Sequence, residues 1–270
     1  MKKFSSLLIN INGISGVLYK VEKRNTDRLV IYAIGAPAIP DNGQLSDAPF
    51  ILDFDVDLFA PDYIGFGRSD GSFTPQNCIK TFLQLYKDFK NGCIAKNGYL
   101  NLEFSMQYKE VLFIGRSFGG LYLSWLPKYL PEINNLCFIF PILDFVECGK
   151  IKGEETPDRF FRAMNEDGYS HLYRGINLMV WKRHFNNEDG LCPMKSVSHL
   201  AKTKVFIAHG KNDKNINVRH SIKYHRLLQK TFPKNKEQFK LKIYNGDHSF
   251  LTSNKAVVDY LKWIGIRKSK

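Results

Sequence analysis

Residues 111–120 read Val-Leu-Phe-Ile-Gly-Arg-Ser-Phe-Gly-Gly, and this stretch decides the fold. Its apolar start predicts a strand, its centre fits G-x-S-x-G, and the residues after it predict a helix to about Leu130. A strand that turns sharply into a helix needs small residues two positions before and after the serine. The stretch therefore predicts that Ser117 presents its hydroxyl above a sheet, as a nucleophile does.

A serine hydroxyl is a poor nucleophile at neutral pH, so it needs a general base and an acid that orients the base. Residues 205–213 read Val-Phe-Ile-Ala-His-Gly-Lys-Asn-Asp, an apolar run followed closely by Asp213. Residues 244–248 read Tyr-Asn-Gly-Asp-His and place His248 just after the last predicted strand. The order Ser117, Asp213, His248 predicts a catalytic triad. Asp144, which follows the strand predicted at 136–140, stays a second candidate for the acid.

Predicted strands and helices alternate along most of the chain. Apolar runs predict strands at residues 7–12, 16–22, 29–34, 56–60, 111–114, 136–140, 205–208 and 239–244. Helices are predicted from Thr74-Pro75, after Ser117, through 222–228 and over 254–266. This alternation predicts an α/β protein with a mostly parallel sheet that is covered on both faces.

Residues 145–200 interrupt the alternation. They are rich in aromatic residues, their spacing is helical, and Thr156-Pro157 is a helix start signal. We expect a cap insertion over one end of the sheet, within a single domain of residues 1–270, because no long Pro/Gly linker flanks it. The aromatic residues expected to form the core of the cap, and in part to line a pocket, are Phe160, Phe161, Tyr169, Tyr173, Trp181 and Phe185.

With these motifs in this order, the chain resembles the α/β-hydrolase superfamily over nearly its whole length. Residues 60–71, Ala-Pro-Asp-Tyr-Ile-Gly-Phe-Gly-Arg-Ser-Asp-Gly, resemble the loop that these enzymes carry after their fourth strand. That loop and the short cap most resemble the prolyl-oligopeptidase-type and esterase-type branches. The resemblance implies an α/β-hydrolase fold with a mostly parallel, eight-stranded sheet. It also implies hydrolysis of an ester, amide or peptide bond through an acyl-serine intermediate.

The resemblance further implies an oxyanion hole made of backbone N–H groups. Phe118, directly after the nucleophile, would supply one of them. Residues Gly35-Ala36-Pro37 stand where the family places the first oxyanion-hole turn, and Ala36 would supply the second. The family often has His-Gly here and this chain has Ile34-Gly35, which removes no backbone donor. Pro37 has no N–H, so the second donor cannot lie one residue further on.

The alternative function is a non-catalytic binding protein of the same fold. Such proteins usually lack a member of the triad, and all three candidates are present here, so a serine hydrolase is favoured. Its substrate is expected to be a small molecule or a peptide, and both a carboxylesterase and a small-peptide peptidase fit the sequence. Arg116 is open to two interpretations, which are contact with a substrate carboxylate or, preferably, a structural ion pair.

The positive charge is concentrated at the end of the chain. Residues 201–270 hold 17 Lys/Arg and 4 Asp/Glu, an excess that equals the net charge of +13 for the whole chain. Lysine (28) outnumbers arginine (11), and no Arg-rich or aromatic-interleaved basic run is present. We therefore expect a general lysine bias and no specific nucleic-acid partner.

Neither a cofactor nor a metal is expected. Asp53, Asp55 and Asp57 alternate, but a calcium loop would need Gly and Glu where Leu58 and Ile64 stand, so an exposed strand face is preferred. No dinucleotide-binding glycine motif is present.

The sequence also bears on location. Its 5 cysteines are odd in number and have no CxxC spacing, which favours reduced thiols in the cytoplasm. The longest apolar run, 136–143, is far shorter than the about 20 residues of a membrane-spanning helix. Met1-Lys2-Lys3 is a basic start, but no signal-peptide pattern follows it.

Overall fold

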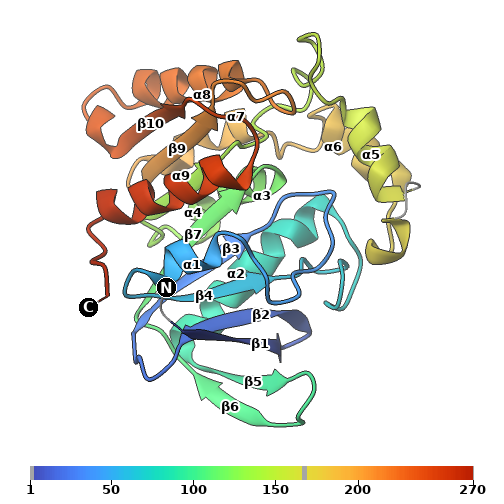
Figure 1. Cartoon of the computed structure of the whole chain (residues 1–270). Helices are drawn as coiled ribbons and strands as arrows, with labels where there is room; N and C mark the ends of the chain where they lie inside the picture. The colour runs from blue at the N-terminus through green and yellow to red at the C-terminus, as the bar shows by residue number, and fades with distance from the viewer. Residues whose placement is uncertain (1–2, 166–168, 270) are drawn as a thin grey trace.

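The structure is a computed structural model that describes residues 3–165 and 169–269. Its centre is one ten-stranded sheet in the order β10-β9-β8-β7-β3-β4-β2-β1-β5-β6 (Figure 1). The strands are β1 (Phe4–Ile11), β2 (Ile14–Val21), β3 (Arg28–Ala33), β4 (Asp57–Pro61), β5 (Cys93–Asn97), β6 (Glu103–Met106), β7 (Glu110–Arg116), β8 (Asn135–Ile139), β9 (Lys204–Gly210) and β10 (Phe239–Tyr244). From β10 to β4 neighbouring strands are parallel, and from β4 to β6 they are antiparallel.

The predicted α/β architecture is confirmed, but the expected number of eight strands is wrong. All eight strands predicted from the sequence are present, and β5 and β6 add an antiparallel hairpin at the β1 edge. The hairpin was missed because its strands are short and largely exposed, with only Ala95, Asn97 and Met106 buried. An edge hairpin with so few inward-facing apolar residues gives a weak alternating pattern.

Helices cover both faces of the sheet. Phe113 of β7 packs on Phe82 of α2, whereas Phe206 of β9 packs on Tyr260 of α9. The register through β8 places Phe113 and Phe206 on opposite faces, so α2 and α9 also lie on opposite faces (Figure 1). The helices of this core are α1 (Ala48–Leu52), α2 (Pro75–Asn91), α3 (Phe118–Leu123), α4 (Leu126–Tyr129), α8 (Val218–Thr231), η3 (Lys236–Gln238) and α9 (Phe250–Trp263).

Helix α2 shows how the sequence sets an element boundary. Asn77 N–H donates to the Thr74 hydroxyl oxygen at 3.1 Å, so Thr74 is the N-cap that the sequence predicts, and Pro75 opens the first turn. Proline suits this place because the first N–H groups of a helix have no intrahelical acceptor.

Short helices fill the segment between β8 and β9. They are α5 (Pro157–Asn165), η1 (Ser170–Leu172), α6 (Leu178–Phe185), α7 (Pro193–Ser196) and η2 (Val197–Leu200). Figure 1 shows α5 and α6 beyond one end of the sheet. Residues 166–168 of the predicted cap, like Met1-Lys2 and Lys270, lie outside the described residues.

The predicted aromatic core of this segment is largely buried. Phe160, Tyr173, Trp181 and Phe185 are buried, and Phe161 and Tyr169 are half-buried. Trp181 stacks on Phe73, with ring centroids 5.0 Å apart, and its indole N–H donates to the Phe73 carbonyl at 3.0 Å. The segment therefore shares one hydrophobic core with the sheet.

The expected exposed face at Asp53, Asp55 and Asp57 is wrong for the last of them. Asp57 is fully buried and accepts a hydrogen bond from the Tyr108 hydroxyl at 2.9 Å. Lys20 lies 3.1 Å from the same carboxylate. A charged partner offsets the free-energy cost of burying a carboxylate. The sequence of one strand does not show that such a partner is present.

The 5 cysteines are free thiols. Among the residues that the structure describes, no helix is long and apolar enough to cross a membrane.

Candidate active site

Ser117 stands on a strained turn between β7 and α3. Its backbone has φ 53° and ψ −118°, a conformation that a non-glycine residue rarely adopts. A β-carbon on Gly115 would lie 2.7 Å from Gly120 N, and one on Gly119 would lie 2.3 Å from Ala33 O. Both glycines of the motif are therefore required by close backbone approach, as the sequence predicts.

The candidate acid and the candidate base follow β9 and β10, which lie beyond β8 on one side of β7. Asp213 follows β9 and His248 follows β10, and these parallel neighbours end at the same edge as β7. His248 Nδ1 lies 2.7 Å from Asp213 Oδ2. His248 and Ser117 line the same cavity, and Asp213 contacts the Nδ1 side of the imidazole, which leaves Nε2 on the opposite side of the ring. The three residues that the sequence selects are thus brought to one place.

Asp213 lies in a dense set of hydrogen-bond donors. Its Oδ1 accepts the N–H groups of Asn215 at 2.9 Å and Ile216 at 3.0 Å. Its Oδ2 lies 3.3 Å from His209 Nε2, besides its contact with His248. Burial raises the pKa of Asp213, but the hydrogen bonds from His209 and His248 outweigh it and hold the pKa well below its usual range. The Asp213 carboxylate of the folded protein is therefore ionised at ordinary pH.

His209 of β9 contacts the candidate acid from inside the sheet. It is fully buried in β9, and its Nε2 lies 2.8 Å from the Ile216 carbonyl, which only accepts. Its Nδ1 lies 2.8 Å from the Ser221 hydroxyl. Nε2 therefore carries the proton, with the Ile216 carbonyl and, at 3.3 Å, the Asp213 carboxylate as its acceptors. The sequence signal for this role is its place four residues before Asp213.

The second acid candidate has another partner. Asp144 Oδ1 accepts a hydrogen bond from the Asn187 side-chain amide at 2.7 Å. The His248 imidazole is hydrogen-bonded to Asp213 instead. This geometry favours Asp213 over Asp144 as the acid.

Arg116 connects the nucleophile turn to the base. Its Nη2 donates to the His248 carbonyl at 2.7 Å, and its guanidinium carbon lies 4.5 Å from the Phe250 ring centroid. The preferred expectation of a structural ion pair is replaced by this hydrogen bond and cation–π contact. Since Arg116 precedes Ser117 directly, one residue links the main chains that carry the candidate nucleophile and the candidate base.

The cavity at Ser117 has a volume of about 750 Å³. Residues 34–46 supply much of its lining, and Asp41, Asn42 and Gln44 make residues 41–44 its polar part. A second part is apolar and comprises Ile142, Phe145, Phe160, Tyr169 and Ile216. The cavity therefore offers one polar and one apolar region beside the same serine.

The expected pocket residues of the insertion divide into two groups. Phe160 and Tyr169 line the cavity, whereas Trp181 and Tyr173 are buried in packing contacts outside its lining. The sequence missed Ile142, Phe145 and Ile216. The only signal for Ile142 and Phe145 was that the apolar run of β8 continues past the end of the strand, and this signal does not apply to Ile216, which follows β9.

The oxyanion-hole candidates flank Ser117. A β-carbon on Gly35 would lie 3.2 Å from Ser117 Cβ, so the segment that carries Ala36 passes directly beside the nucleophile, and Ala36 lines the cavity. Phe118 is the first residue of α3, where an N–H has no intrahelical acceptor. Its side chain is buried against Phe160 and away from the cavity. Only its N–H would serve the hole.

No metal site accompanies these residues in the described ranges. Within 3–165 and 169–269, no group of three or more His, Cys, Asp or Glu side chains is placed to hold a metal ion.

Similarity to known proteins extends over the fold and the catalytic segment. Residues 157–264 match the model of the prolyl oligopeptidase family. The esterase PF2001 from Pyrococcus furiosus is 16% identical with a TM-score of 0.60, covering 98% of this chain and 92% of that chain. Est1E from Butyrivibrio proteoclasticus is 15% identical with a TM-score of 0.63, covering 96% and 98%. A monoacylglycerol lipase from Paleococcus ferrophilus is 14% identical with a TM-score of 0.55, covering 86% and 93%. No curated protein sequence matches.

At these identities the solved structures show a common fold, and the family match adds the serine-hydrolase segment that carries Asp213 and His248. The resemblance read from the sequence is confirmed in the fold and in the class of enzyme: the chain has the α/β-hydrolase fold and is a serine hydrolase.

Proposed function

We propose that this hydrolase is a carboxylesterase that works through the triad Ser117, His248 and Asp213. The observation that carries the proposal is the 2.7 Å contact between His248 Nδ1 and Asp213 Oδ2 at a cavity that the strained Ser117 also lines. A base oriented by a buried, ionised carboxylate beside an activated serine is the arrangement that acyl transfer requires.

The steps follow from these positions. His248 Nε2 accepts the Ser117 proton as Oγ attacks the ester carbonyl, and the carbonyl oxygen becomes an oxyanion. The N–H groups of Phe118 and Ala36 stabilise that oxyanion. The imidazolium then protonates the departing alkoxide, which leaves an acyl-serine. A water molecule, deprotonated by His248, then attacks the acyl-serine through the same kind of oxyanion. The Ser117 oxygen leaves and takes the proton from His248, which releases the carboxylic acid and restores Ser117. Asp213 stays ionised throughout and holds the imidazole in the tautomer that faces the serine.

The cavity lining supports a small ester with one apolar side. The apolar region around Phe145, Phe160 and Ile216 suits an aliphatic or aromatic acyl group. The polar region at residues 41–44 suits a hydroxylated leaving group. We propose that residues 145–200 act as a cap on this site, since Phe160 and Tyr169 of that segment line the cavity.

Peptide hydrolysis is the second candidate, and the family match over residues 157–264 supports it. A panel of p-nitrophenyl esters of increasing acyl length and of aminoacyl p-nitroanilides separates the two. A carboxylesterase turns over the esters with kcat/KM at least about 10⁴ M⁻¹s⁻¹ and the anilides far more slowly. Efficient cleavage of anilides alone would select the peptidase. Turnover of neither set would favour the non-catalytic binding protein.

The cytoplasmic location and the lack of a specific nucleic-acid partner stay predictions from the sequence.

A further inference from the structure

Tyrosine hydroxyls hold both ends of the segment that carries Ala36. The Tyr63 hydroxyl donates to the Ile34 carbonyl at 2.6 Å, two residues before Ala36. The Ala38 N–H donates to the Tyr173 hydroxyl oxygen at 3.0 Å, two residues after it. The segment forms part of the cavity wall beside Ser117. A small shift of its backbone would therefore move the Ala36 N–H relative to Ser117.

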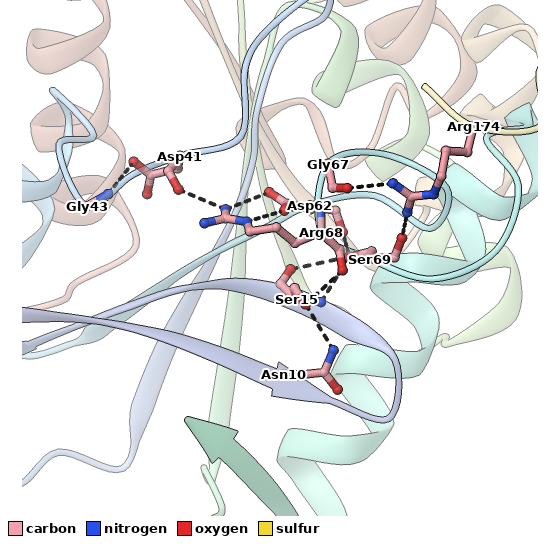
Figure 2. A network of polar contacts seen from close by, with 9 residues as sticks. All are labelled: Asn10, Ser15, Asp41, Gly43, Asp62, Gly67, Arg68, Ser69 and Arg174. Atoms are coloured by element: carbon pink, nitrogen blue, oxygen red, sulfur yellow. Dashed lines mark hydrogen bonds and ion pairs between the residues drawn. The ribbon is translucent and has the colours of Figure 1, made fainter. Parts of the chain in front are cut away.

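Tyr173 belongs to the insertion, and its own main chain is fixed to the loop after β4. Residues 172–174 run beside residues 65–73, with Gly67 N–H donating to Leu172 O at 2.8 Å and Phe73 N–H donating to Arg174 O at 2.7 Å. The Arg174 guanidinium donates to the carbonyls of Gly67, at 2.6 Å, and Ser69 (Figure 2).

That loop is itself held by an ion pair whose carboxylate is buried. Arg68 Nε lies 2.7 Å from Asp62 Oδ2, and Asp62 is fully buried. Figure 2 shows Arg68 between Asp62 and Asp41, whose carbonyl it also reaches at 2.8 Å. A continuous set of hydrogen bonds therefore runs from the loop after β4 through residues 172–174 to the segment beside Ser117.

The Tyr173 ring is seated independently of its hydroxyl. It is buried, and its centroid lies 4.8 Å from those of both Phe66 and Phe73. Burial raises the pKa of Tyr173 far above its usual range, so the hydroxyl stays neutral. The residue is outside the cavity lining, so it touches no substrate there.

We propose that Tyr173 is a positioning residue for the oxyanion hole, acting through Ala38 to hold the Ala36 N–H toward the oxyanion. The proposal rests on the proposed function, which takes Ala36 as a donor. A donor to the oxyanion acts only once charge develops on the carbonyl oxygen, so its misplacement lowers kcat and leaves KM unchanged.

Tyr173→Phe tests this because it removes one oxygen and keeps the ring. Deleting an oxyanion-hole donor lowers kcat by about 10²–10³-fold. Because Tyr173→Phe only loosens the donor, we expect it to lower kcat on p-nitrophenyl butyrate by about 10-fold, with KM unchanged. Phenylboronic acid forms a tetrahedral adduct with the serine, so its inhibition constant should rise by the same factor. Tyr63→Phe, which frees the other end of the segment, should act in the same direction.

Tyr224→Phe is the matched control. Tyr224 is also fully buried, and its hydroxyl lies 3.4 Å from the Ser196 hydroxyl, outside the cavity lining. Its removal should leave kcat, KM and boronic-acid inhibition at wild-type values. Circular dichroism and melting temperature verify that each variant is folded.

Wild-type kcat and boronic-acid affinity in Tyr173→Phe, or a change in KM alone, would overturn the inference. Failure of the proposed function looks different. In that case Ser117→Ala retains hydrolysis, or a fluorophosphonate does not label wild-type protein at Ser117. If a fluorophosphonate labels Ser117 and Tyr173→Phe behaves as the wild type, the inference about Tyr173 is wrong and the proposed function stands.

Discussion

The ends of β7, β9 and β10 and residues 145–200 meet at one cavity, but the sequence signals that place them there differ in kind. Each catalytic candidate follows an apolar run within a few residues, so its place depends on one strand end and on neighbouring parallel strands. The insertion contributes through packing on distant segments, as Trp181 does on Phe73. The chemistry of the site is thus set by short local motifs, and the shape of the cavity by tertiary packing.

Replacing the nucleophile should have the largest effect. Ser117→Ala is expected to lower kcat by about 10⁴-fold or more with the fold intact, because no acyl-enzyme can form. Steady-state assays on p-nitrophenyl esters measure this. Ser46→Ala, a serine in the lining of the same cavity, is the control and should keep wild-type turnover. Comparable losses in both variants would argue against a unique nucleophile.

Replacing the candidate acid should lower kcat nearly as much as replacing the candidate nucleophile. Asp213→Asn is expected to lower kcat by about 10⁴-fold, since the imidazole would adopt the wrong tautomer. Asp144→Asn, with its carboxylate paired to Asn187 in the wild type, should retain most activity. The opposite ranking of the two variants would transfer the acid role to Asp144.

In the insertion, Trp181→Ala should act on stability. Trp181 is fully buried and stacked on Phe73, so its truncation should lower the free energy of unfolding by about 3–5 kcal/mol. Relative rates among esters of different acyl length should stay as in the wild type. Urea denaturation measures the loss. Leu178→Ala, on the same helix and 57% exposed, should change little.

Tyr169→Ala should act on selectivity, because Tyr169 is half-buried and lines the cavity. Opening the apolar region should shift the ratio of kcat/KM for long and short acyl esters by about 10-fold. Tyr99→Ala, at an 81% exposed site outside the cavity lining, is the control. If all esters slowed by one factor, Tyr169 would not shape the substrate region.

The smallest expected effect is a pH dependence of stability. Because the folded-state pKa of Asp213 is depressed, its ionised form stabilises the protein above the ordinary pKa of about 3.9 and this stabilisation is lost as pH falls below that value. The difference in unfolding free energy between wild type and Asp213→Asn should narrow between about pH 6 and about pH 3. Urea titrations over this range measure it, and a constant or widening difference would contradict the depressed pKa.

The sequence was sufficient for the elements whose signals are local. The apolar runs located eight strands, Thr74-Pro75 located a helix start, and the glycines around Ser117 located the turn that presents it. It failed where partners come from elsewhere in the chain. Asp57 is buried because Lys20 and Tyr108 surround it, and the edge hairpin of β5 and β6 has little apolar pattern.

The same distinction applies within the candidate site. Ser117, Asp213 and His248 follow from their motifs, whereas the roles of His209, Arg116 and Tyr173 depend on contacts across the fold. His209 reaches Asp213 from inside β9, and Tyr173 reaches Ala38 from the insertion. Spacing along the chain alone does not specify such contacts.

Labelling with a fluorophosphonate, followed by mass spectrometry of the labelled peptide, tests the central claim most directly. The account predicts one phosphonate per chain, located on Ser117, with no labelling of Ser117→Ala. It also predicts strongly slowed labelling of His248→Ala, because the base is needed to activate the serine. Stoichiometric labelling of Ser117→Ala at another residue, or undiminished labelling of His248→Ala, would contradict it.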